Sequence, residues 1–181
     1  MQVLSFLVDL FLGYIPQATG CAIMLLVIAG EPIKSKRFLV ISAVYTGIAV
    51  CVRFLYQAGL VNFGFHTLII WALYIIFAVM VFKLPAIKAL VSVLPSGLAI
   101  ALAEIVSIPV LIGILGNDRF NEIMNNAVDV ETKIAKSICG APANMLFVAF
   151  VLVFARVIVV RRAKLSAAEK TSAKDNNTAE F

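Results

Sequence analysis

The sequence predicts an all-α protein, a polytopic transmembrane helical bundle with about five spans. Three observations lead to this prediction. Of the 181 residues, 62% are hydrophobic and only 14% are charged, whereas soluble domains are about 45–50% apolar and about 25% charged. Several apolar runs approach or exceed the roughly 20 residues that cross a bilayer as a helix. The basic residues stand in short clusters between these runs, a pattern typical of membrane topology signals.

The predicted spans form one transmembrane domain over residues 1–162, followed by a short polar cytoplasmic tail over residues 163–181. The expected spans cover residues 3–29, 38–55, 66–82, 86–112 and 142–160. Asp9 and Pro16 interrupt the first span. Because proline removes a backbone donor and favours a kink, we interpret this segment as one kinked span. The alternative is a short interfacial helix before Pro16 and a short span after it.

Charges in the connections set the predicted orientation. The basic residues gather before the second span, before the fourth span and after the fifth: Lys34, Lys36, Arg37, Lys83, Lys88, Arg161, Arg162 and Lys164. The 56–65 connection has no lysine or arginine. The 116–137 connection is weakly acidic, and its apolar spacing predicts an external amphipathic helix at the membrane surface. The positive-inside rule therefore places the N-terminus outside the cell membrane and the C-terminus in the cytoplasm.

Glu104 is the most informative single residue, because an acid inside a membrane span is costly and marks a functional site by default. Counted from Ala86, it lies about 27 Å along a helix that rises about 1.5 Å per residue, in the outer half of its span. Arg53, His66 and Asp9 reach the same layer under the predicted topology. These four residues predict an outward-facing polar cavity for a peptide or small ligand, with Arg53 paired to Glu104. In the alternative, Arg53, His66 and Asp9 face water at span ends, and Glu104 has a structural pairing role.

Catalytic and metal-binding patterns are absent from the sequence. There is one histidine, and no nucleophile-elbow or nucleotide-binding motif occurs. The three cysteines lack C-x-x-C spacing. Since the basic residues do not share a polar face with interleaved aromatics, nucleic acid is not an expected partner. We therefore expect a protein that is not an enzyme and that has no cofactor or metal.

A resemblance becomes visible from the second span onward. The segments are Arg53-Phe-Leu, Val61-Asn-Phe-Gly-Phe-His66-Thr, Lys88-Ala-Leu and, in the next span, Glu104. They resemble the membrane sensor region of certain clostridial-type sensor histidine kinases, which are related to Agr-type peptide-sensing receptors. The resemblance implies a region that receives an external signal and passes it to a cytoplasmic kinase domain.

Only a short polar segment follows Arg162, so we expect a stand-alone, sensor-like or regulatory membrane module without kinase activity. Its expected partners are the lipid bilayer and either a separate kinase or another membrane protein. Two other classes stay open. One is the substrate-binding membrane subunit of a small-molecule importer, although the first span lacks a clear small-x-x-x-small docking pattern. The other is a membrane assembly factor without a ligand.

Overall fold

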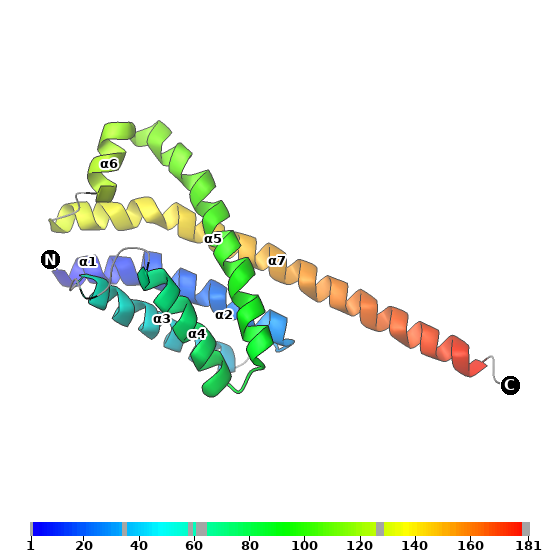
Figure 1. Cartoon of the computed structure of the whole chain (residues 1–181). Helices are drawn as coiled ribbons and strands as arrows, with labels where there is room; N and C mark the ends of the chain where they lie inside the picture. The colour runs from blue at the N-terminus through cyan, green and yellow to red at the C-terminus, as the bar shows by residue number, and fades with distance from the viewer. Residues whose placement is uncertain (1, 34–35, 58–59, 61–64, 126–128, 179–181) are drawn as a thin grey trace.

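The structure, a computed structural model, describes residues 2–33, 36–57, 60, 65–125 and 129–178. These described residues are almost entirely helical and contain no strand, which confirms the all-α prediction (Figure 1). The elements are α1 (Gln2–Asp9), the π-helical turn η1 (Leu10–Tyr14), α2 (Ile15–Ala29), α3 (Lys36–Gln57), α4 (Phe65–Met80), α5 (Ala86–Leu115), α6 (Asn117–Asn125) and α7 (Val130–Thr178).

Four helical segments are long and apolar enough to cross a membrane. They are Val3–Ala29, Lys36–Leu55, Ala86–Leu115 and Val130–Ser166. The first of them runs through α1, η1 and α2 without a break, as a single first span requires. The apolar helix His66–Met80 is shorter, because the chain turns at Val81 and Phe82. The predicted membrane class is therefore supported, while the five-span count stays a prediction.

The α2 helix is the core of the bundle. Every residue from Gly20 to Ile28 is buried, and α2 contacts α3, α5 and α7. A helix that is hydrophobic all round is expected to be covered by other elements. The other long spans leave many large apolar side chains exposed, as helices in contact with lipid do. The first span thus forms the centre around which the other spans pack.

The last helix is longer than predicted at both ends. It begins at Val130 rather than near residue 142 and continues to Thr178. Asp129 explains the early start, because its carboxylate accepts a hydrogen bond from the Thr132 N–H at 3.3 Å, the usual contact of an N-cap residue. The 116–137 connection is therefore split into the short amphipathic helix α6 and the first turns of α7. Most of the 56–65 connection lies outside the described residues.

Two aromatic contacts join α4 to its neighbours. The Tyr45 and Tyr74 rings stack 3.9 Å apart, and each hydroxyl donates to the other residue's backbone carbonyl, at 3.1 and 3.0 Å. One turn earlier on α4, the Trp71 ring lies against Gly97 of α5, where an added Cβ would come within 2.7 Å of it. The shorter helix α4 is thereby fixed between α3 and α5.

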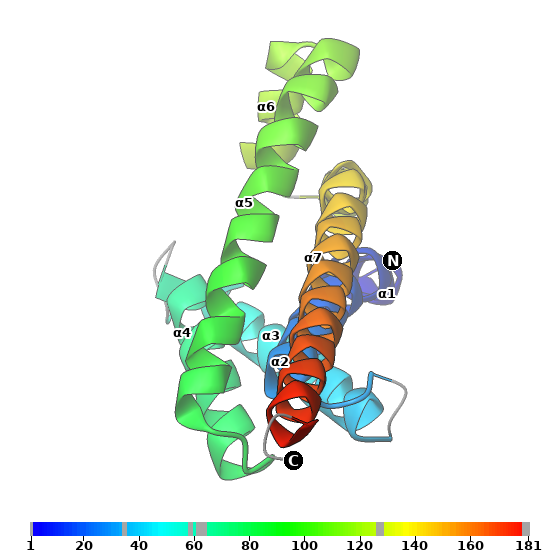
Figure 2. The same ribbon diagram turned by 90° about the vertical axis from the view of Figure 1, so that its right-hand side faces the viewer.

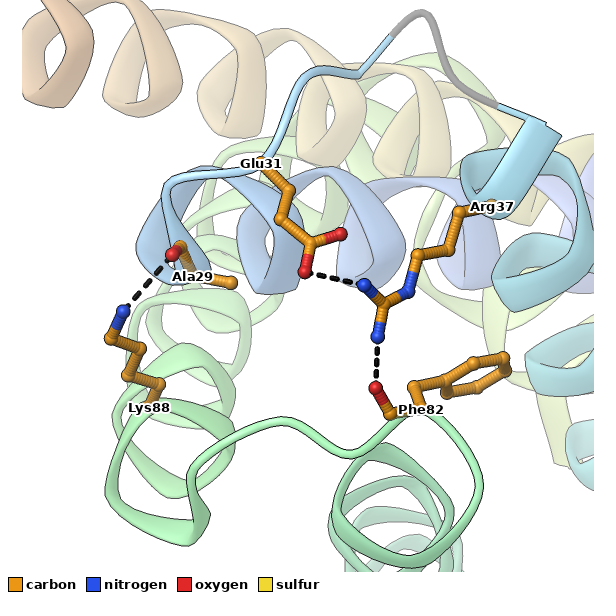
Figure 3. Close-up of polar contacts among 5 residues, drawn as sticks. All are labelled: Ala29, Glu31, Arg37, Phe82 and Lys88. Carbon is orange, nitrogen blue, oxygen red and sulfur yellow. Dashed lines mark hydrogen bonds and ion pairs between the residues drawn. The ribbon is translucent and has the colours of Figure 1, made fainter.

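Basic side chains cap the C-terminal end of α2. Arg162 of α7 donates to the carbonyls of Val27 and Ile28 at 2.6 and 3.0 Å, and Lys88 of α5 donates to the Ala29 carbonyl at 3.0 Å (Figure 3). The last carbonyls of a helix have no partner within it, and the negative end of the helix dipole favours cations. The left-handed Gly30, at φ 84°, ends the helix.

Arg37 connects this end of the bundle to the turn that follows α4. It forms an ion pair with Glu31 at 2.6 Å and donates to the Phe82 carbonyl (Figure 3). The three basic connections predicted to share one side of the membrane therefore meet at one end of the bundle. We call this end, formed around Arg37, Lys88 and Arg162, the basic end.

Replacing Arg162 with glutamine should lower the free energy of unfolding by about 0.5–2 kcal/mol, since a cation at a partly buried helix C-terminus contributes about that much. Thermal unfolding in dodecyl maltoside measures the change. Arg161→Gln is the matched control, because Arg161 adjoins it on α7 and, among the described residues, only Arg162 of this pair donates to the α2 carbonyls. Equal effects of the two substitutions would contradict the capping role of Arg162.

Candidate functional site

A polar cavity of about 790 Å³ lies at the end of the bundle opposite the basic end. Helix α3 runs from Arg37 at the basic end to Arg53 at the cavity, and α5 runs likewise from Lys88 to Glu104. Helices α5 and α7 diverge toward this end, and α6 joins them (Figures 1 and 2). The cavity is lined by residues of all the helical elements except α4: Asp9, Gly13, Tyr14, Gln17, Arg53, Glu104, Ser107, Ile108, Leu111, Phe120, Met124, Lys133, Lys136, Ser137, Cys139, Gly140, Ala143 and Asn144.

Three of the four residues predicted to share a polar layer line this cavity. They are Asp9, Arg53 and Glu104. His66 is not among the lining residues; it begins the apolar part of α4, and its Nε2 lies 3.3 Å from Thr67 Oγ1. Helix α4 packs against α3 and α5 and contributes nothing to the lining. His66 therefore lies outside the lining of this cavity, although it interacts electrostatically with Arg53.

Asp9 is held by the last helix. It ends α1, and its Oδ1 accepts a hydrogen bond from Ser137 Oγ of α7. The same serine hydroxyl lies 2.9 Å from the Lys133 carbonyl. Asp9 is half-buried. Its carboxylate therefore joins the N-terminal helix to α7 instead of pointing freely into water.

The π-helical turn beside the cavity depends on Pro16. Without an N–H, Pro16 cannot donate to the Leu12 carbonyl as a helical residue would. Asn144 of α7 takes over this role, with its Nδ2 donating to the Leu12 carbonyl at 2.7 Å. The Asn144 Oδ1 accepts from Gln17 Nε2 at 2.9 Å. The segment around Pro16, where a kink was predicted in the first span, is thus hydrogen-bonded to the last span through Asn144.

The pairing expected between Arg53 and Glu104 is not formed. Within the described part of the chain, the one ion pair joins Arg37 to Glu31. Arg53 instead lies over the Tyr14 ring, 5.7 Å from its centroid, a favourable cation–π position. The physical reason is the helix arrangement, because α3 contacts α2, η1 and α4 while the described residues show no packing of α3 on α5. Glu104, on α5, therefore faces the cavity from another side.

Helix α6 closes the cavity at the chain's reversal between α5 and α7. Phe120 and Met124 line the cavity, and Ile123 is buried. Lys136 of α7 donates from Nζ to the Met124 carbonyl at 2.6 Å, near the C-terminus of α6. This bond matches the preference of helix C-termini for cations. The short amphipathic helix predicted here forms a cover over charged groups.

Sequence reasoning missed several polar residues of the site: Gln17, Lys133, Lys136, Ser137 and Asn144. Gln17 and Asn144 carried a usable signal, because amides within apolar spans commonly hydrogen-bond between helices. The other three lay in a segment assigned to a connection, so their place on the last helix was hidden. Only the early start of α7 brings them beside Asp9.

Comparison with known proteins adds no assignment. No family model matches the chain, and neither curated proteins nor solved structures gave a match. Among the described residues, no group of three or more His, Cys, Asp or Glu side chains is placed to hold a metal ion. The arrangement offers charges of both signs and amides around a cavity whose volume is typical of small-molecule sites. Binding of a polar ligand is the chemistry that this geometry supports.

Proposed function

We propose that this protein is a sensor-like regulatory membrane module that binds a ligand in the polar cavity and transmits its occupancy to the basic end. The observation that carries the proposal is the course of α7. This one helix supplies Lys133, Lys136 and Ser137 to the cavity and, farther along, Arg162 to the cap of α2. A shift of α7 at the cavity would therefore also change the position of Arg162 at the basic end.

The contacts around the cavity suggest how occupancy would move α7. A ligand between α5, α6 and α7 competes with the bonds that join Lys136 to Met124 and Ser137 to Asp9. Changing these bonds alters the position of α7 relative to α1 and α6. The caps at Val27 and Ile28 then move with the helix, because packed helices shift as rigid elements.

The proposed orientation places the cavity outside the cell membrane and the basic end in the cytoplasm. It is supported by the positive-inside rule together with the meeting of three basic connections at one end. The partner proposed at the cytoplasmic side is a separate kinase or another membrane protein, whose binding or activity would depend on the position of α7.

The native Cys139 provides a test, because it lines the cavity while Cys21 is buried. In a Cys51→Ser background, a membrane-impermeant methanethiosulfonate reagent added to intact cells should modify Cys139, and the further change Cys139→Ser should abolish the modification. In the purified protein, a bulky reagent on Cys139 should then raise hydrogen exchange in residues 26–31 and 158–166. That increase would report loosening of the α2 cap.

Two results would contradict the proposal. Failure of the external reagent to reach Cys139 would contradict the proposal that the cavity opens to the outside. Complete modification of Cys139 without any change in hydrogen exchange at residues 158–166 would contradict the proposed transmission along α7. Uptake of a small molecule by vesicles that contain only this protein would favour the importer alternative, and a flat uptake result would favour signalling.

A further inference from the structure

The charges that line the polar cavity form no ion pair with one another within the described residues. Three cations, Arg53, Lys133 and Lys136, and two carboxylates, Asp9 and Glu104, face the same space. None of them takes part in an ion pair within the described residues, where the one ion pair lies at the basic end. Charges placed within a membrane protein are costly unless a partner offsets them. The lining therefore has room for charges supplied by a ligand.

The two signs are contributed by different helices. Lys133 and Lys136 come from α7, Arg53 comes from α3, and Lys136 interacts electrostatically with both Arg53 and Asp9. This side of the cavity keeps an excess of positive charge, since it holds three cations and one carboxylate. Glu104 comes from α5, which diverges from α7 toward this end of the bundle (Figure 1). The cavity is thus positive on one side and carries a single carboxylate on another.

Apolar side chains complete the lining. They are Ile108 and Leu111 of α5 and Phe120 and Met124 of α6. They follow Glu104 along the chain toward the cover formed by α6. A ligand that fits this lining has two charged groups of opposite sign and a short apolar part. A ligand with a single charge would leave either Glu104 or the cations without a partner.

We propose that the cavity binds a zwitterion that carries an anionic group and a primary ammonium group. Arg53, Lys133 and Lys136 receive the anion, and Glu104 accepts hydrogen bonds from the ammonium. This assignment rests on the proposed function, because it names the ligand class of the same cavity. Two sources share this chemistry: a soluble zwitterion and the ethanolamine headgroup of a phospholipid.

Protection of Cys139 against the thiol reagent tests the assignment in dodecyl maltoside, whose headgroup is neutral. The probes are lysophosphatidylethanolamine, lysophosphatidic acid as the anion alone and hexadecylamine as the cation alone. Lysophosphatidylethanolamine should bind at least about tenfold more tightly than either probe that carries charge of one sign only, which corresponds to about 1.4 kcal/mol. Glycerophosphoethanolamine separates the sources: protection by it identifies a soluble ligand, and protection by the lipid alone identifies a headgroup. Either result supports the zwitterion.

Charge variants show which residue receives which group. Glu104→Gln should abolish the preference for lysophosphatidylethanolamine over lysophosphatidic acid, and Lys133→Gln should weaken both phosphate-bearing probes. Glu122→Gln, in the exposed part of α6, and Lys83→Gln, near the basic end, are matched controls that should change neither. Glu104 is exposed toward the cavity, so its replacement by glutamine should not disturb the fold. The rate at which Cys139 reacts without any probe, measured in each variant, checks that the site is intact.

The outcomes separate the two proposals. Protection by hexadecylamine or lysophosphatidic acid as strong as that by lysophosphatidylethanolamine would overturn the zwitterion assignment and leave the cavity as a ligand site. An unchanged preference in Glu104→Gln, or no protection by any probe, would overturn the assignment as well. A Cys139 that the reagent cannot reach would overturn the proposed function itself.

Discussion

Replacing Gly20 with alanine is expected to lower the free energy of unfolding by about 1–3 kcal/mol, the usual cost of inserting a methyl group into a packed core. An added Cβ would lie 2.7 Å from Phe147 Cζ and closer still to Cε1. The Phe147 ring cannot give way easily, because only 1% of it is exposed. Since Gly20 of α2 lies directly against Phe147 of α7, the loss should appear as a lower unfolding midpoint in dodecyl maltoside.

Gly47→Ala is the matched control for this substitution. Gly47 also lies within a helix, and nothing lies within 4 Å of its added Cβ. Alanine is favoured over glycine in a helix by about 0.5–1 kcal/mol, so this variant should be unchanged or slightly more stable. The double variant Gly20→Ala with Phe147→Leu should recover part of the lost stability. A Gly20→Ala protein as stable as Gly47→Ala would contradict the close packing of α2 on α7.

Replacing Asn144 with leucine is expected to be the most damaging polar substitution, at about 1–3 kcal/mol. The leucine cannot donate to the Leu12 carbonyl, which Pro16 also cannot satisfy, and an unsatisfied buried polar group costs about that much. Gln17→Leu removes only the amide–amide bond and should cost about 0.6–1 kcal/mol, near the average for hydrogen bonds between membrane helices. Unfolding in mixed micelles with a denaturing detergent measures both values.

A double-mutant cycle isolates the role of the proline. Pro16→Ala restores an N–H that can donate to Leu12, so Asn144→Leu should cost less in this background than in the native chain. The difference is the coupling free energy between the two positions. Additive effects of the two substitutions would show that Asn144 does not replace the missing proline donor. The same cycle reports whether the π-helical turn of the first span needs α7.

Much of the fold follows from local sequence properties. Apolar run length predicts the long helices, and the basic clusters predict which connections share an end of the bundle. The polar layer was also partly predictable, because Asp9, Arg53 and Glu104 reach one depth by helix rise alone. His66 does not line the cavity, because depth along a helix does not say which way the helix faces. The start of α7 was missed because its first turns are polar and resemble a connection.

Apolar content, run length and charge clusters are enough to predict a helical membrane protein with charged residues gathered in layers and basic residues at one end. The packing of the helices is needed to learn that α2 is the central helix, that Asn144 bonds to Leu12, and that Arg53 lies over Tyr14 instead of pairing with Glu104. The reason is physical. In a membrane, faces toward lipid and faces toward other helices are both apolar, so hydropathy does not distinguish them. Small differences in shape, such as Gly20 opposite Phe147, decide which helices meet and so where the cavity forms.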